Sequence, residues 1–152
     1  MLLKRLTEAS GVSGYESEVR DLLRAEISGR VDEIRVDNIG NLIATKRGPE
    51  GSPRIMIAAH MDEIGLIISH IDKSGLLRFK KVGGIDDRVL VAKTVLVGPN
   101  KIPGVVGAKP IHLQEEGEAE KPFRHDQLYI DIGAKSREEA EEKVKLGDAV
   151  CF

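Results

Sequence analysis

The stretch Ile55-Met56-Ile57-Ala58-Ala59-His60-Met61-Asp62 decides the fold that the sequence predicts. Its first five residues are apolar, and they follow a segment at 47–53 that is rich in glycine and proline. A short continuous apolar run after such a loop is typical of a strand buried on both faces of a layered α/β sheet. We therefore predict a central strand over 55–59 that presents His60 and Asp62 at its carboxyl end, where open α/β sheets bind ligands.

The residues before this run predict helix followed by a hairpin. Ser13 and Glu16 have the spacing of a capping box, and apolar residues then recur at helical intervals as far as Ile27. From residue 31 apolar and charged residues alternate, and the turn-forming sequence 37–41 leads into a second short apolar run. We expect the first thirty residues to be helical and the next segment to form a β-hairpin.

Beyond Gly65 the pattern changes to short strands separated by turn residues. Such spacing favours a small barrel or sandwich, and we place the boundary between the two parts of the chain near Gly65. The strands expected there cover residues 66–71, 76–82, 89–97, 102–106 and 128–132.

Three other segments complete the expected architecture. The acidic stretch 113–122 has little to bury, which predicts a mobile loop. Ser136 and Glu139 cap a short helix that we expect over 138–144, and residues 148–152 begin another strand.

Composition narrows the classes of function. The chain has 23 basic and 25 acidic residues and no basic stripe interleaved with aromatic residues, so nothing favours nucleic-acid binding. Charges interrupt the leucines at the N-terminus, and no apolar run approaches membrane-spanning length. Cys151 is the single cysteine, which fits a reducing compartment, so we expect a cytoplasmic protein without a membrane partner. A charged fraction of 32% beside few amide residues also predicts a thermophilic source.

His60 and Asp62 are the candidate site residues. A neutral imidazole is a good ligand for zinc or cobalt, and a nearby carboxylate can fix the tautomer of the ring. Taken alone, the pair is weak evidence, because most buried polar groups are bonded for purely structural reasons.

The sequence around the pair is more specific. Residues 58–65, Ala58-Ala59-His60-Met61-Asp62-Glu63-Ile64-Gly65, closely resemble the metal-site motif of the tetrahedral aminopeptidase family. These are cytosolic glutamyl and deblocking aminopeptidases that are often labelled endoglucanases. Further motifs resemble the same family in the same order, and the resemblance covers the whole chain. They lie at 10–16, 37–42, 83–90, 104–113 and 129–134.

The resemblance implies an α/β fold in which the first part of a layered metallopeptidase domain is followed by a small inserted β-barrel. Residues 1–64 would be the N-terminal portion of the catalytic domain, 65–148 the barrel used for subunit contacts, and 149–152 the return into the catalytic domain. By the family pattern, His60 would be a ligand of one of two divalent metal ions, zinc or cobalt. Asp62 would orient that ligand and tune the catalytic site.

The remaining ligands of such a site would follow the barrel in the family pattern, and this chain stops before them. Even one catalytic zinc ion usually has three protein ligands, so one histidine cannot hold a catalytic metal pair. We therefore expect the N-terminal fragment or half of a two-metal aminopeptidase that removes N-terminal residues from peptides and is inactive by itself. Its expected partners are a peptide substrate and either further copies or a complementing chain with the missing residues.

Other readings stay open. The chief alternative is a non-catalytic assembly or binding module built on the barrel. A carbohydrate hydrolase is less well supported, since it would need two carboxylates flanking a sugar site.

The remaining polar motifs favour structural roles. His70 is expected to be structural or on the surface, His112 to belong to a loop or subunit contact, and His125 has no partner spacing. Residues 86–88, Asp-Asp-Arg, fit a local ion pair or cap on a turn.

Overall fold

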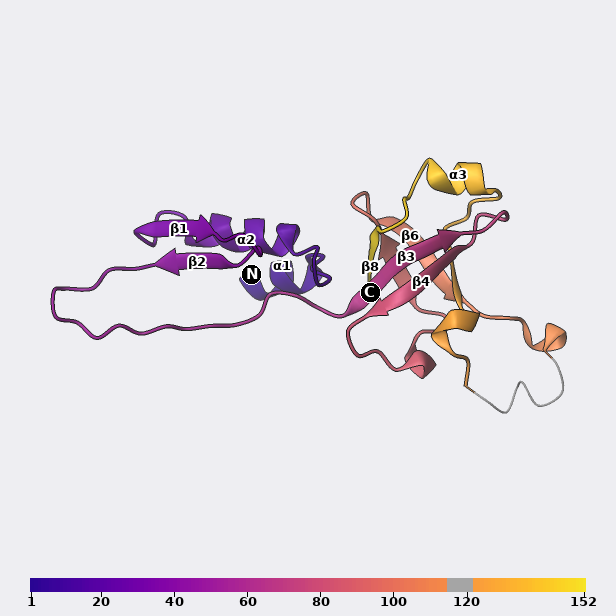
Figure 1. Cartoon of the computed structure of the whole chain (residues 1–152), viewed down its shortest axis with the longest axis horizontal. Coiled ribbons are helices and arrows are strands. Elements are labelled where there is room, and N and C mark those ends of the chain that lie inside the picture. The colour runs from indigo at the N-terminus through magenta and orange to yellow at the C-terminus, as the bar shows by residue number, and fades with distance from the viewer. Residues whose placement is uncertain (115–121) are drawn as a thin grey trace. The chain divides into compact units, whose positions relative to one another are not determined.

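The structure, a computed structural model, describes residues 1–114 and 122–152. Most of the acidic segment expected at 113–122 lies outside the described residues. The chain divides into two compact units, Met1–Asp62 and Glu63–Phe152, which we call the N-terminal unit and the barrel unit and describe separately (Figure 1).

The N-terminal unit contains two helices and a hairpin. Helices α1 (Leu2–Glu8) and α2 (Ser17–Ile27) are followed by strands β1 (Glu33–Val36) and β2 (Leu42–Thr45). The two strands pair in an antiparallel hairpin, as the alternating pattern predicts. Its turn is closed by Asp37, whose side chain accepts hydrogen bonds from the backbone of Ile39 and Asn41. This turn meets α2, because Arg20 donates to the carbonyl of Gly40 at 3.2 Å.

The expected capping box is wrong. Helix α2 begins at Ser17, and Glu16 occupies its N-cap without a side-chain cap bond. Ser13 lies in a turn before the helix, where the following Gly14 has a φ of +89°. The carboxylate of Glu16 bends back to accept from the backbone N–H of Gly14 at 2.6 Å. The carboxylate of Glu16 therefore stabilises the turn before the helix and does not cap the helix.

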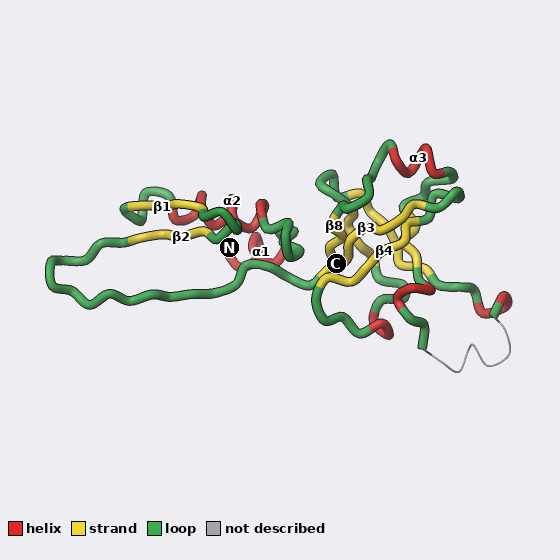
Figure 2. Tube along the Cα trace, viewed as in Figure 1, coloured by secondary structure: helices red, strands yellow, loops and turns green. Residues whose placement is uncertain are grey.

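The expected central strand over 55–59 is also absent. This segment is extended but forms no strand, and Ile55 and Ile57 are 81% and 93% exposed (Figure 2). A strand buried on both faces needs neighbours at both edges and layers above and below. In the described part of the N-terminal unit, the sheet contains only β1 and β2, which pair with each other. The apolar run has no sheet to join.

The barrel predicted for the second part of the chain is confirmed. Its strands form a closed antiparallel sheet in the order β3-β4-β7-β6-β5-β8. The strands are β3 (Gly65–Ile71), β4 (Leu77–Val82), β5 (Thr94–Val97), β6 (Ile102–Gly107), β7 (Tyr129–Asp131) and β8 (Ala149–Cys151). Closure occurs where β3 pairs with β8, Leu66 lying opposite Val150.

The barrel interior is filled by the inward-facing apolar residues of every strand. In β5, Val95 and Val97 are buried, whereas Thr94 and Leu96, which alternate with them, are exposed. In β3 the register shifts between Ile68 and His70. This bulge restores Ile71 to the interior and leaves His70 exposed.

Short helices connect the strands. The 3-10 helix η1 (Asp87–Val89) ends at the first residue of the strand expected over 89–97, and residues 90–93 form a turn in which Ala92 has a φ of +64°, so β5 is shorter than predicted. Helix α3 (Arg137–Glu141) has the predicted cap, with Ser136 accepting from the backbone of Glu139 at 3.2 Å. Within the described ranges, no helix is long and apolar enough to cross a membrane.

Candidate functional site

His60 and Asp62 meet as the sequence analysis proposes. Nδ1 of His60 lies 3.1 Å from Oδ1 of Asp62 and 3.0 Å from the backbone carbonyl oxygen of the same residue. Both partners can only accept, so in the neutral ring Nδ1 carries the proton. The lone pair is then on Nε2, and the side chain of His60 is 85% exposed. The ring is therefore in the tautomer that offers Nε2 to a ligand.

Asp62 is held from its other side by Ser13. The hydroxyl of Ser13 donates to Oδ2 of Asp62, whereas Oδ1 faces His60. The bond from Ser13 is the main cause that lowers the pKa of the Asp62 carboxyl, and the bond to His60 lowers it further against an opposing effect of burial. Asp62 is accordingly an anion at neutral pH, which suits a hydrogen-bond acceptor.

Tight backbone packing fixes the turn that carries Ser13. Val12 is 1% exposed, and its carbonyl accepts from the backbone of Tyr15 at 2.7 Å. Gly11 approaches α2 and the backbone before Asp62 so closely that a Cβ there would lie 2.8 Å from Val19 and 3.2 Å from the carbonyl of Met61. A glycine is needed at this close approach. The segment 10–16, identified from its resemblance, thus brings Ser13 to Asp62.

The donor set fits one position of a divalent-metal site. An imidazole whose Nδ1 is bonded to a carboxylate and whose Nε2 is available is the usual arrangement of a metal-ligating histidine. Among residues 1–114 and 122–152, no three histidine, cysteine or acidic side chains are grouped closely enough to hold a metal ion. His60 is therefore a candidate for a single ligand.

The other histidines of the expected structural class have different surroundings. His70 is exposed on β3, and its Nε2 lies 3.5 Å from a guanidinium nitrogen of Arg137. His112 is exposed within the 3-10 helix η2 (Ile111–Leu113). Neither has an acidic partner within the described part of the chain.

The predicted local role of Asp86 and Arg88 is confirmed. Asp86 accepts from the backbone of Arg88 and pairs with its guanidinium, which lowers the pKa of Asp86 to about 2.

Asp87 and His125 contact each other within the barrel unit. Asp87 pairs with Lys81 at 2.5 Å and accepts from the backbone of His125 at 2.9 Å. The ring Nδ1 of His125 also lies 3.4 Å from the Asp87 carboxylate. The contact between His125 and Asp87 spans 38 residues of the chain, which agrees with the absence of any local partner spacing around His125 in the sequence.

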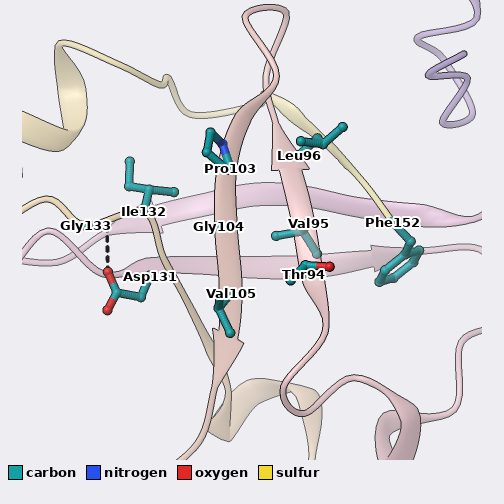
Figure 3. Close-up of a pocket in the computed structure, with 10 residues that line it drawn as sticks. All are labelled: Thr94, Val95, Leu96, Pro103, Gly104, Val105, Asp131, Ile132, Gly133 and Phe152. Carbon is teal, nitrogen blue, oxygen red and sulfur yellow. Dashed lines mark hydrogen bonds between the residues drawn. The ribbon is translucent and has the colours of Figure 1, made fainter. Parts of the chain in front are cut away.

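A groove of about 570 Å³ lies on the barrel unit (Figure 3). Strands β5 and β6 form its floor, with Ile132 and Phe152 beside them. Its acidic residue, Asp131, accepts from the backbone of Gly133 at 2.7 Å. The groove is lined mostly by apolar residues, with Thr94 and Asp131 as its polar side chains.

Comparison with known proteins identifies the family. The model described as M42 glutamyl aminopeptidase matches residues 40–152, and a second model, described as AMPT, matches residues 1–23. The first match covers most of the chain and includes His60, Asp62 and the whole barrel. This chain belongs to the M42 glutamyl aminopeptidase family.

Individual relatives agree with this assignment. A lysyl aminopeptidase of Pyrococcus furiosus is 42% identical over 93% of this chain and 41% of its own length. The TET1 peptidase of Pyrococcus horikoshii, which can assemble into a tetrahedron or a large octahedral shell, is 47% identical with a TM-score of 0.87, covering 99% of this chain and 45% of that one. A Thermotoga maritima protein described as an endoglucanase is 42% identical with a TM-score of 0.86, covering 99% of this chain and 44% of that one. The chain thus spans less than half the length of these relatives.

Proposed function

We propose that this chain forms the N-terminal part of a two-metal aminopeptidase in which His60 is a metal ligand and Asp62 orients it. One observation carries the proposal: Asp62 accepts from Nδ1 of His60, which leaves Nε2 as the ligating atom. The pair lies within the segment that matches the family model.

The chemistry assigned to this chain is limited. Two divalent ions, zinc or cobalt, would polarise the scissile carbonyl of a peptide and activate a water molecule. Nε2 of His60 would fill one ligand position, while Asp62 keeps the proton on Nδ1 and strengthens the imidazole as a donor. With one such ligand among its described residues, the chain by itself is expected to be inactive.

The extended segment 55–59 supports the same proposal. Its three large apolar residues, Ile55, Met56 and Ile57, are at least 81% exposed. They would become a buried strand when the rest of a layered α/β sheet pairs with them. Completion of that sheet would bring the remaining ligands to the strand end that carries His60.

The experiment is a chimera. Residues 1–152 are joined to the part of the Pyrococcus furiosus lysyl aminopeptidase that follows its matching segment, and hydrolysis of aminoacyl nitroanilides is assayed with zinc or cobalt. We expect activity in the chimera and none in the 152-residue chain. His60→Ala should abolish the activity and reduce the bound metal.

His70→Ala is the matched control, since His70 is also an exposed histidine that follows an apolar run. It should leave both activity and metal content unchanged. An active chimera that retains full metal and activity in His60→Ala would contradict the assignment of His60. Activity in the isolated chain would contradict its dependence on a complementing segment.

The alternative function is a non-catalytic assembly or binding module built on the barrel, whose groove over β5 and β6 has a mostly apolar lining. Because relatives such as the TET1 peptidase assemble into closed shells, we propose that the complete protein is a homo-oligomer. Sedimentation measures whether the 152-residue chain and the chimera assemble, and the nitroanilide assay measures whether the chimera is active. Together the two measurements separate the two functions. A chain that assembles but gives no active chimera would favour the module.

A further inference from the structure

Ser13 is joined to the candidate metal ligand through one intermediate side chain. Its hydroxyl donates to Oδ2 of Asp62, and Oδ1 of that carboxylate faces Nδ1 of His60 at 3.1 Å. The two carboxylate oxygens thus have separate partners. One holds the carboxylate in place, and the other faces the imidazole.

The turn around Ser13 is rigid enough for this role. Val12 is buried, Gly11 packs directly beside Met61, and Glu16 closes the turn by accepting from Gly14. Ser13 is 49 residues from Asp62 in the chain, so their contact depends on the folded N-terminal unit. The hydroxyl is presented from this packed turn to Asp62, the last residue of a described segment, 46–62, that is assigned no strand.

We propose that Ser13 is a positioning residue that holds Asp62 in the rotamer that fixes the tautomer of His60. This inference rests on the proposed function, in which Nε2 of His60 is the ligating atom. Without Ser13 the carboxylate rotates away from Nδ1, and only the backbone carbonyl of Asp62 remains to retain the proton there. The imidazole then shares its proton between the two nitrogens, and the fraction that can ligate through Nε2 falls.

The test uses the 152-residue chain and needs no metal. Nitrogen-15 chemical shifts of His60, measured at a pH where the ring is neutral, give the ratio of the Nδ1–H to the Nε2–H tautomer. In the unaltered chain Nδ1–H should dominate. In Ser13→Ala the ratio should fall about two- to fivefold, the range expected for loss of one exposed hydrogen bond.

Ser13→Thr and Ser13→Val form the matched pair. Both add the same bulk at Cβ, and only threonine keeps the hydroxyl. We expect Thr to retain the ratio of the unaltered chain and Val to behave as Ala does. Backbone resonances of Val12 and Val19 report whether the N-terminal unit stays folded in each variant.

Three outcomes would overturn the proposal. The ratio would be the same in all variants, or Thr and Val would lower it equally, or all three variants would lose the ordered resonances of Val12 and Val19. The last result would make Ser13 a structural residue. Failure of the proposed function would appear in a different measurement, the bound metal and activity of the His60→Ala chimera. The tautomer ratio is measured in the 152-residue chain without metal and does not depend on that result.

Discussion

The two units of this chain are stabilised in different ways. The barrel unit buries apolar side chains from all six strands and its connecting segments. In the described N-terminal unit the buried apolar side chains are Ala9, Val12 and Val19. The unit also contains polar contacts, such as those of the Asp37 turn and the pair between Arg5 of α1 and Glu26 of α2. One unit is closed around its own core, and the other keeps apolar surface exposed beside the candidate site.

Sheet closure explains the difference. Each barrel strand has a hydrogen-bonded neighbour on both sides, and each contributes one face to the same interior. The β1–β2 hairpin has two strands, and a two-stranded sheet is at best marginally stable in water without further packing. The segment 46–62 lacks strand pairing, so its conformation depends on surrounding structure.

The largest effect is expected from truncating the barrel core. Leu77 is fully buried, and Leu77→Ala should cost about 2–5 kcal/mol through lost burial and an unfilled cavity. Ile57→Ala removes a side chain of similar size that is 93% exposed, and should change stability by less than about 0.5 kcal/mol. Urea unfolding followed by circular dichroism measures both. Equal effects would remove the distinction between the units.

Filling a close contact in the barrel should have the next largest effect. A Cβ at Gly104 would lie 2.8 Å from Cγ2 of Ile130 and 3.1 Å from Cγ2 of Ile132, so Gly104→Ala should cost about 1–3 kcal/mol by overpacking. Gly84→Ala is the control, since no heavy atom would lie within 4 Å of its Cβ. The same urea titration compares them. A neutral Gly104→Ala would mean that the barrel wall yields to an added methyl group.

A smaller and local effect is expected at the Asp37 turn. Asp37→Ala removes the acceptor for Ile39 and Asn41, and amide exchange in β1 and β2 should accelerate about two- to tenfold. Asp37→Asn keeps a side-chain oxygen and should give a smaller change. Exchange in β3 and β4 should be unaffected by either substitution. A matching acceleration in the barrel would show that the two units unfold together.

The smallest effect concerns pH. The partner Arg88 holds the pKa of Asp86 at about 2, below the ordinary value of 3.8. Between these values the unfolded chain binds the extra proton, so the stability due to this pair is complete above pH 4 and is lost as the pH falls towards 2. Asp86→Asn should therefore reduce the loss of stability on acidification by a small amount, because the pair is exposed. Unfolding titrations at pH 5 and pH 3 give the loss of unfolding free energy on acidification. An equal loss in Asp86→Asn and in the unaltered chain would contradict the prediction.

The barrel was predictable from sequence because the signals that define its strands lie within the strands and their turns. The apolar and charged residues that alternate in Leu77-Arg78-Phe79-Lys80 indicate which side chains face the interior, and turn residues mark the ends of the strands. The bulge that turns His70 outward was not visible, since it depends on the pairing of β3 with β4. The cap by Asp86 was predicted, but the 3-10 helix η1 that it begins was not.

Predictions for the N-terminal unit depended more on context. The apolar run 55–59 has the sequence of a buried strand. A buried strand needs neighbouring strands, and none of the strands in the described residues pairs with this run. Ser13 and Glu16 had the right spacing for a cap, yet each side chain bonds elsewhere. The pairing of His60 with Asp62 was predictable because the two residues are two positions apart, whereas the contact from Ser13 spans 49 positions.

The pairing of β3 with β8 has a consequence for chain connectivity. Leu66 near the start of the barrel lies opposite Val150 near its end, so the two ends of the unit are neighbouring strands, about 5 Å apart. The two ends of the folded barrel are therefore held a short, fixed distance apart, however many residues the barrel contains. Once folded, the barrel adds little loop-closure entropy to the surrounding chain.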